Sequence, residues 1–334
     1  MKKYVNLFVF VFMIGACLSQ GRAQTKSAVS YKNPVVDIAM PDPTVIKAAD
    51  GYFYVYATES TRNVPIMKSK DLVEWTYCNT AFTNKTRPRF EPKAGIWAPD
   101  INYINGKYVL YYAMSVWGGE QTCGIGVATA NSPQGPFTDH GKMFRSNEIG
   151  VQNSIDPSLL QYEGRNYLVW GSFRGIYVIE LTADGLSIMS GAKKKRIAGT
   201  AFEAVYIHKH GDYYYMFASI GSCCQGVKST YKVVVGRSKK VWGPYKDKTG
   251  KPMLKNGYSL VIGANDHFVG NGHGSQIIQD DAGQDWLLYH GFSRSTPENG
   301  RILLLDQIKW DQEGWPYVEG GSPSYETQKA PVFN

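Results

Sequence analysis

A short two-part motif recurs along this chain, and residues 154–173 (SIDPSLLQYEGRNYLVWGSF) contain a clear copy of it. The first half is an Asp-Pro pair followed by a short apolar run. The second half is an aromatic, β-branched run that ends on Gly171, and a turn at Glu163-Gly164 separates the two. Short apolar runs bounded by glycine and proline are typical of paired β-strands.

The second half of this motif occurs five times. Its copies close at positions that are 47 to 72 residues apart, namely Ala57, Ala113, Gly171, Ala218 and His290. Each interval accommodates one four-stranded sheet with its turns. Since the intervals show little helical periodicity, the repeat predicts an all-β fold, a five-bladed β-propeller that forms a single domain.

The first half of each copy contributes a polar side chain. Asp42, Asp156 and Glu203 lie 15 residues before their closing residues, while Asp100 lies 13 before and His273 lies 17 before. The first strand of a propeller blade runs along the central axis, so we expect these side chains to converge on one pocket. A single Asp-Pro pair would indicate only a turn, but four carboxylates and a histidine in register favour a functional site.

Residues 1–23 have the pattern of an export signal, because two lysines precede an apolar stretch that is too short to span a membrane. Cleavage after Ala23 would leave residues 24–334 as the propeller domain. The alternative is a bacterial lipoprotein signal that ends before Cys17. We expect export to the periplasm or the medium, and lipid attachment through Cys17 remains the open alternative.

The charge pattern gives little support to nucleic-acid binding. Removal of residues 1–23 lowers the formal net charge from +8 to +5, and the remaining basic residues are scattered. The one cluster, at 193–196, follows a glycine-containing turn and is typical of a solvated loop. We expect a monomer that contacts a membrane only through the alternative lipid anchor.

Four cysteines remain after residue 23, and none has the spacing of a zinc site. They are Cys78, Cys123, Cys223 and Cys224. Export permits disulfides, but a core of this size does not require them. Their pairing is left open, and the adjacent cysteines 223 and 224 are not expected to close a normal loop together.

Converging carboxylates point to glycosidic bond cleavage. One carboxylic acid protonates the leaving oxygen and one carboxylate activates water. A third carboxylate nearby raises the pKa of the acid by like-charge repulsion. Asp42, Asp156 and Glu203 would supply these three groups.

At these residues the chain resembles glycoside hydrolase family 43, and within it the endo-1,5-α-L-arabinanases. The resemblance covers nearly all of the mature chain. It rests on Asp42-Pro43, on Trp-Ala-Pro-Asp at 97–100, on Ile-Asp-Pro at 155–157 and on Glu203. It implies that Asp42 is the base, Asp156 the pKa modulator and Glu203 the acid.

Two further phrases resemble the arabinanase branch, Ser-Cys-Cys at 222–224 with residues 229–238, and Gly-Asn-Gly-His-Gly-Ser at 270–275. By resemblance, His273 helps to hold a cation, calcium in most relatives, through water at the propeller axis; no organic cofactor is expected.

The chain departs from the arabinanase pattern at two places that bear on whether it cleaves within chains. The segment 172–176 lacks a tryptophan that many arabinanases have, and Leu304 replaces an arginine that often precedes the final tryptophan by six residues, although Arg301 is near.

Four residues are candidates for sugar binding. Trp97 is expected to be a stacking platform, with core packing as the alternative. Asp100 would contact sugar or cap its strand, and Asn153 and Ser172 are candidate sugar contacts beside the modulator strand.

These features predict an inverting hydrolase of α-1,5-linked L-arabinan that cleaves within chains. The alternatives are an exo-arabinanase, an α-L-arabinofuranosidase or a β-xylosidase of the same family. A sugar-binding propeller without turnover is less favoured, because the acids differ between blades and His273 occurs once.

Overall fold

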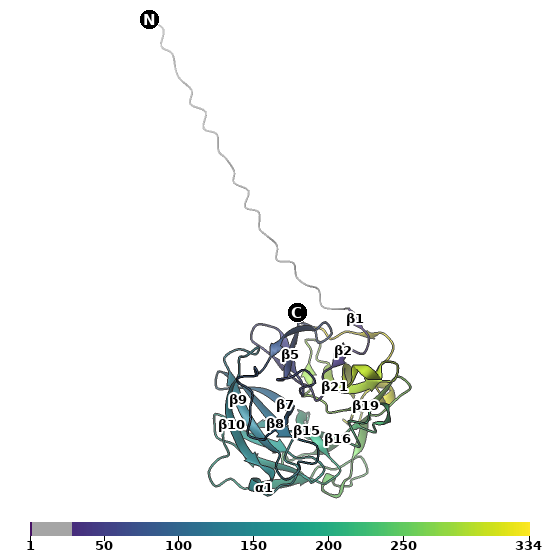
Figure 1. The fold of residues 1–334 in the computed structure, drawn as a ribbon. Coiled ribbons are helices and arrows are strands. Elements are labelled where there is room, and N and C mark those ends of the chain that lie inside the picture. Colours follow the sequence, from purple (N-terminus) through teal and green to yellow (C-terminus); the bar gives the residue numbers. More distant parts are fainter. Residues whose placement is uncertain (2–28) are drawn as a thin grey trace.

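The structure is a computed structural model that describes Met1 and residues 29–334. Five antiparallel sheets follow one another around a central axis in the order of the sequence (Figure 1). This arrangement confirms the predicted five-bladed β-propeller. The expected export signal and Cys17 lie outside the described residues, apart from Met1. In the part that is described, no helix is long and apolar enough to cross a membrane.

The blades are defined by their strands, named from the axis outward. Blade one is β3 (Thr44–Lys47), β4 (Phe53–Tyr56), β5 (Pro65–Ser69) and β6 (Thr76–Thr80). Blade two is β7 (Gly95–Ile104), β8 (Lys107–Ser115), β9 (Gly124–Ala130) and β10 (Thr138–Arg145). Blade three is β11 (Ser158–Tyr162), β12 (Arg165–Trp170), β13 (Ile176–Glu180) and β14 (Lys195–Ala198). Blade four is β15 (Glu203–His210), β16 (Tyr213–Ile220), β17 (Lys232–Ser238) and β18 (Ser259–Ile262).

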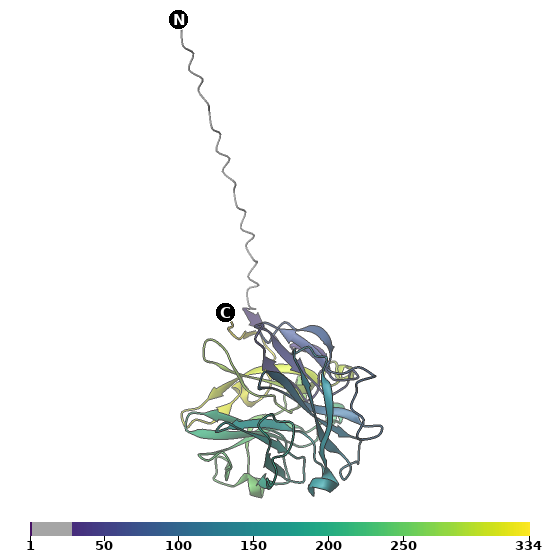
Figure 2. The ribbon, with the colours of Figure 1, turned by 90° about the vertical axis from the view of Figure 1, so that its left-hand side faces the viewer.

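Blade five closes the ring with a strand from the other end of the chain. It contains β19 (Phe268–Gly272), β21 (Asp285–Ser293), β22 (Ile302–Trp310) and, outermost, β2 (Val36–Ala39). Two short strands extend it, β20 (Ile278–Gln279) on β21 and β23 (Pro316–Tyr317) on β22. A separate pair joins β1 (Ser30–Tyr31) to β24 (Gln328–Lys329), so the C-terminus lies beside β1 in both views (Figures 1 and 2).

Within Met1 and residues 29–334, helical structure is confined to single turns between strands. These are α1 (Ser146–Ile149) and the 3₁₀ turns η1 (Gly226–Lys228), η2 (Met253–Lys255), η3 (Pro297–Asn299) and η4 (Glu319–Gly321).

The core of the described residues contains five large apolar clusters, each between two neighbouring blades, and a small sixth one around Ala113, Cys123 and Ile155. Successive side chains of a strand point to opposite faces of its sheet. In β8, Leu110 and Tyr112 pack toward blade one, whereas Val109 and Tyr111 pack toward blade three. Both faces are therefore buried, which explains why the strands are continuous apolar runs. Truncation of a fully buried leucine such as Leu110 to alanine should cost about 2–5 kcal/mol.

Candidate active site

Five residues at one end of the axis have left-handed backbone conformations, one in each blade. They are Asp42 (φ 54°), Ala98 (φ 42°), Asp156 (φ 56°), Ala204 (φ 53°) and His273 (φ 49°). In blades two and four, the strand register also shifts at this point. Bulges of this kind redirect the chain and its side chains, and left-handed backbone costs roughly 1–2 kcal/mol per non-glycine residue.

This geometry corrects the sequence register in two blades. The residue equivalent to Asp42 is Ala98 in blade two and not Asp100, and Ala204 in blade four and not Glu203. Glu203 nevertheless reaches the axis, because it begins β15 directly before the bulge.

A cavity of about 660 Å³ opens at this end of the propeller, and all five blades contribute to its wall. Such a volume is typical of ligand-binding sites. Every predicted site residue except Asp100 lines it: Asp42, Trp97, Asn153, Asp156, Ser172, Glu203 and His273.

Asp42 is held as a carboxylate. Burial alone would raise its pKa, but Arg301, His273 and His290 outweigh this effect and bring the pKa well below its usual value. Oδ1 of Asp42 lies 2.8 Å from Arg301 Nη1 and 3.2 Å from His273 Nδ1. The backbone N–H of Asp42 donates to His290 Nδ1 at 3.0 Å. An ionised, oriented carboxylate is suited to the role of a general base.

Asp156 and Glu203 form a second acidic centre, in which the pKa values are raised and not lowered. Burial raises the pKa of both carboxyls, and the charge of Glu203 raises that of Asp156 further. Hydrogen bonds from Ser172 and Tyr231 oppose the shift at Glu203 without cancelling it. Because the two groups interact, the pair retains a proton in the neutral range and can supply a general acid.

Asn153 and Ser172 form a chain of hydrogen bonds to Glu203. Nδ2 of Asn153 donates to the Ser172 hydroxyl at 2.9 Å, and this hydroxyl donates to Glu203 Oε2 at 2.6 Å. Both residues line the cavity, but in this structure their contacts orient the acidic side chain.

Asp100 lies deeper along the axis and does not line the cavity. Its side chain is buried and accepts hydrogen bonds from the Tyr206 hydroxyl (2.6 Å), Asn102 Nδ2 (2.7 Å) and the backbone N–H of Leu159 (2.7 Å). Burial raises the pKa of Asp100 to about 6. The expected contact with sugar is therefore not supported, and Asp100 joins the inner strands of blades two, three and four.

Two tryptophans form an aromatic wall at the rim. The rings of Trp97 and Trp117 have centroids 5.7 Å apart, and Trp117 is 78% exposed. Exposed aromatic faces of this kind can stack against sugar rings. Sequence analysis did not identify Trp117, although a tryptophan followed by two glycines in a loop is a recognisable signal.

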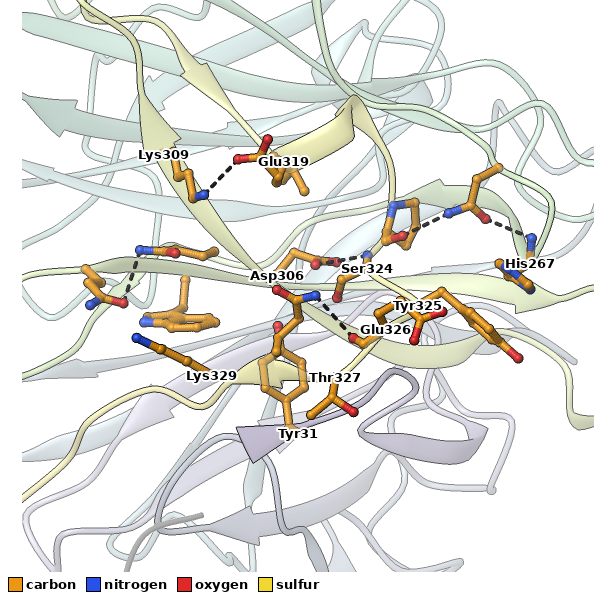
Figure 3. A pocket seen from close by; sticks show the side chains of 17 residues that line it. Tyr31, His267, Asp306, Lys309, Glu319, Ser324, Tyr325, Glu326, Thr327 and Lys329 are labelled. Atoms are coloured by element: carbon orange, nitrogen blue, oxygen red, sulfur yellow. Dashed lines mark hydrogen bonds and ion pairs between the residues drawn. The ribbon is translucent and has the colours of Figure 1, made fainter. Parts of the chain in front are cut away.

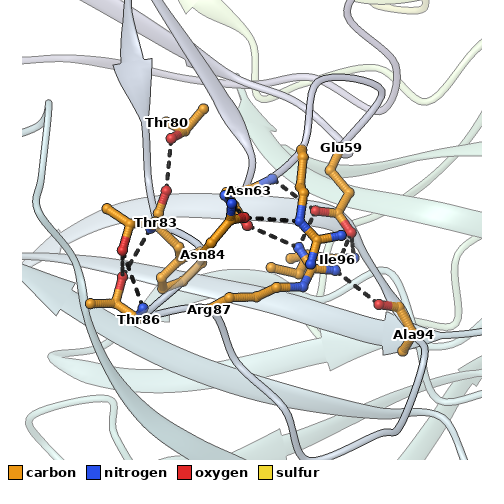
Figure 4. A network of polar contacts seen from close by, with 11 residues as sticks. Glu59, Asn63, Thr80, Thr83, Asn84, Thr86, Arg87, Ala94 and Ile96 are labelled. Atoms are coloured by element: carbon orange, nitrogen blue, oxygen red, sulfur yellow. Dashed lines mark hydrogen bonds and ion pairs between the residues drawn. The ribbon is translucent and has the colours of Figure 1, made fainter.

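A buried polar network supports the loop beside Trp97 (Figure 4). The Arg87 guanidinium forms an ion pair with Glu59, whose carboxylate also accepts the backbone N–H groups of Asn63 and Ile96 at 2.9 Å. Arg87 Nη2 donates to the carbonyl of Ala94 at 2.9 Å. Glu59, at the cavity wall, is thereby tied to the start of β7, which carries Trp97.

The opposite wall contains a bond that the sequence left open. Cys223 and Cys224 are joined to each other in a disulfide and line the cavity. The sequence left the pairing open and predicted no normal loop between these two neighbours; the disulfide joins residues that are adjacent in the chain. Cys78 and Cys123 are free thiols in the described chain. An ion pair between Arg174 and Glu120 at 2.8 Å links blades two and three.

The donor groups around His273 fit a cation only if it keeps most of its water. Asp42, Asp156 and Glu203 supply negative charge, but the described residues provide no set of three ligating side chains at the axis. Their charges outweigh burial and raise the pKa of His273. Asp42 Oδ1 is already engaged by Arg301, so His273 would reach such an ion through the ion's water ligands.

A second cavity, of about 700 Å³, lies between blade five and the C-terminal segment (Figure 3). Its charged groups pair with one another. Lys309 contacts Glu319 at 2.8 Å, and Asp306 accepts the hydroxyl of Tyr289 and the backbone N–H of Ser324. It lacks the opposed acids of the axial cavity and is not a candidate catalytic site.

The chain is similar to known proteins of the same architecture. Residues 31–316 match Glycosyl hydrolases family 43. Extracellular exo-α-(1→5)-L-arabinofuranosidase ArbA of Cellvibrio japonicus is 36% identical over 83% of this chain and 86% of its own length. Extracellular endo-α-(1→5)-L-arabinanase 1 of Bacillus subtilis is 36% identical over 82% of this chain and 86% of its own. The α-L-arabinanase of Cellvibrio cellulosa complexed with arabinohexaose superposes with a TM-score of 0.78, at 34% identity, over 87% of this chain and 99% of that one. With three acids at the axial cavity of a five-bladed propeller and a family match that spans most of its length, this chain belongs to glycosyl hydrolase family 43.

Proposed function

We propose that this protein hydrolyses α-1,5-linked L-arabinan with inversion of configuration, cleaving within the chain. The observation that carries the proposal is the division of the site into an ionised carboxylate, Asp42, and a protonated pair, Asp156 with Glu203. Relatives named for arabinan-cleaving activities support the choice of substrate.

In this mechanism Glu203 donates a proton to the leaving glycosidic oxygen. Asp42 accepts a proton from the water that attacks the anomeric carbon. Asp156 interacts with Glu203, so that the two carboxyls share a proton that Glu203 can deliver. Trp97 and Trp117 would hold sugar units by stacking at the rim.

Exo action is the specific alternative, because relatives named as exo- and endo-acting are equally similar to this chain. Product analysis on linear arabinan distinguishes the two modes. Endo cleavage produces a broad ladder of oligosaccharides and an early fall in viscosity. Release of one short product from the first minutes, with little fall in viscosity, would establish exo action.

Glu203→Gln tests the catalytic assignment directly. Loss of the general acid should reduce arabinan cleavage by about 10²–10⁴-fold. An aryl arabinoside with a good leaving group should lose less, since it needs little protonation. Glu120→Gln, at the rim, is the matched control and should retain activity. Equal losses on both substrates would contradict the role of Glu203.

We also propose that the protein is exported, acts as a monomer and holds a cation near His273 through water. Relatives named extracellular support export, and the acidic lining of the cavity supports a cation. A bound cation would favour the charged forms of nearby carboxylates. The mass of the mature N-terminus distinguishes cleavage after Ala23 from lipidation at Cys17.

A further inference from the structure

A second group of chemically active side chains lies at the other end of the inner strands. His208 and His210 are close to the end of β15, whereas Glu203 begins that strand in the catalytic cavity. Five residues of extended chain separate Glu203 from His208 by roughly 15–20 Å. Because the two histidines are two residues apart on a strand, their side chains point to the same face.

Asp285, from the neighbouring blade, completes the group. It begins β21, and His290, further along the same strand, lies beside Asp42. One ligand atom from each of His208, His210 and Asp285 lies within 4.8 Å of the other two. Metal–ligand bonds of 2.0–2.2 Å in a tetrahedral site place ligand atoms about 3.3 Å apart. Side-chain movements of about 1–2 Å would therefore close the three atoms around an ion.

Trp310 of β22 organises all three side chains. Its indole N–H donates to Asp285 Oδ2 at 2.8 Å, while Gln279 Nε2 donates to Oδ1 at 3.1 Å. The ring of His210 stacks on Trp310 with centroids 3.7 Å apart and planes at 7°, and His208 lies at 6.2 Å and 20°. Donors that orient a buried carboxylate are typical of the groups surrounding a metal site.

A simple ion pair does not account for the arrangement. His210 Nδ1 lies 3.7 Å from Asp285 Oδ2, which is too long for a hydrogen bond. Asp285 is 3% exposed at its side chain, and its oxygens are already oriented by neutral donors. The three potential ligand atoms therefore lie close together without a direct bond between His210 and Asp285.

We propose that His208, His210 and Asp285 form a binding site for Zn²⁺ or a similar late transition-metal ion, which links blade four to blade five. Two imidazoles and one carboxylate suit zinc and its neighbours better than calcium or magnesium. Water fills the fourth position. The site is separate from the axial cavity, and it stabilises the fold by binding the native state only.

The test uses the whole mature protein after removal of bound metals. Titration with Co²⁺ should produce the intense visible absorption of four-coordinate cobalt, which saturates at one equivalent and is displaced by Zn²⁺. Calorimetric titration with Zn²⁺ should show the same stoichiometry, and excess Zn²⁺ should raise the melting temperature.

Variants assign the signal to these residues. The double variant His208→Gln/His210→Gln should lose the cobalt absorption and the zinc-dependent rise in melting temperature. Trp310→Phe keeps an aromatic ring beside His210 but removes the donor to Asp285, so Zn²⁺ affinity should fall about 10–100-fold. His140→Gln, an exposed histidine of blade two that bonds Thr129, is the matched control and should bind as the parent does.

His273→Gln should also retain the cobalt absorption, because His273 belongs to the catalytic cavity. Absence of cobalt and zinc binding by the parent protein would overturn the proposal. An unchanged signal in the double variant, or its loss in His273→Gln, would do the same. If the double variant does not fold, His210→Gln replaces it, since this side chain is 37% exposed.

Discussion

The hydroxyl of Ser172 donates a 2.6 Å hydrogen bond to Oε2 of Glu203, while it accepts the amide of Asn153 at 2.9 Å. The single hydroxyl proton is therefore committed to the carboxyl group. A donor to a carboxylate favours its ionised form and lowers its pKa. Burial acts in the opposite sense at Glu203 and dominates. The two effects together set the pH above which the acid loses its proton.

Ser172→Ala should raise the pKa of Glu203, because it removes a donor to the charged form. The basic limb of the kcat/KM profile on arabinan should move upward by about 1 pH unit, as expected for a hydrogen bond to a charged group. Ser222→Ala is the control, since Ser222 lines the same cavity but bonds Thr230. A basic limb that stays in place in Ser172→Ala would show that the hydroxyl does not tune the acid.

Arg301→Gln should raise the pKa of Asp42, because it removes a positive charge 2.8 Å from Oδ1. The base works only when ionised, so activity should disappear at a higher pH on the acid side of the profile. The acid limb should move upward while the basic limb changes less. Arg174→Gln serves as the control, because Arg174 pairs with Glu120 at the rim. Identical acid limbs in the two variants would argue against Asp42 as the base.

Repeated local patterns were sufficient to predict the blades from the sequence. The aromatic runs correspond to the second strands β4, β8, β12, β16 and β21, because a strand buried on both faces has a strongly apolar sequence. The closing strand β2 was not predicted, since its pairing with β22 joins residues more than 250 positions apart and leaves no local signal.

Site residues were predictable where a local sequence motif marks them. They were not predictable where a β-bulge determines which residue faces the axis. Asp-Pro pairs identified Asp42 and Asp156, but a one-residue bulge placed Ala98 and not Asp100 at the equivalent position of blade two. Arg301 and His290 reach Asp42 from blade five, and His208 and Asp285 meet across two blades. Such contacts depend on the angle between sheets, which sequence spacing does not encode.

Arg87→Leu should destabilise the protein by about 3–5 kcal/mol, because it leaves the buried carboxylate of Glu59 without its cation. Urea denaturation measures the loss. The double variant Arg87→Leu/Glu59→Leu should be less destabilised, since no buried charge remains. A double variant as unstable as Arg87→Leu alone would contradict this explanation.

The same ion pair makes stability depend on pH. The pKa of Glu59 is lowered in the native state despite burial, chiefly by Arg87. Its contribution to stability is therefore present above the unfolded pKa and is lost as the pH falls through the native pKa.

Calcium should raise the melting temperature of protein freed of metal, if an ion bound near His273 stabilises the native state by mass action. A concentration 100 times the dissociation constant contributes about 2.7 kcal/mol. His273→Gln should weaken this response, whereas His208→Gln/His210→Gln should preserve it, which separates the axial ion from the zinc site. An equal response of the parent and His273→Gln would exclude His273 as a contact of the ion.

The stereochemical prediction follows from the blades that carry the acids. Asp42 precedes β3 in blade one, and Glu203 begins β15 in blade four, so the two side chains enter the cavity from blades that are not neighbours. Asp156 belongs to blade three, which packs directly against blade four, and is placed to tune the acid.

This placement of Asp42 and Glu203 favours inversion of configuration. Carboxyls roughly 6.5–9.5 Å apart leave room for a water molecule, whereas a retaining enzyme needs about 5–5.5 Å. The first product from linear arabinan should therefore be the β-anomer, visible by proton NMR before mutarotation. An initial α-anomer, or transfer of arabinosyl groups to added methanol, would rule out Asp42 as a water-activating base.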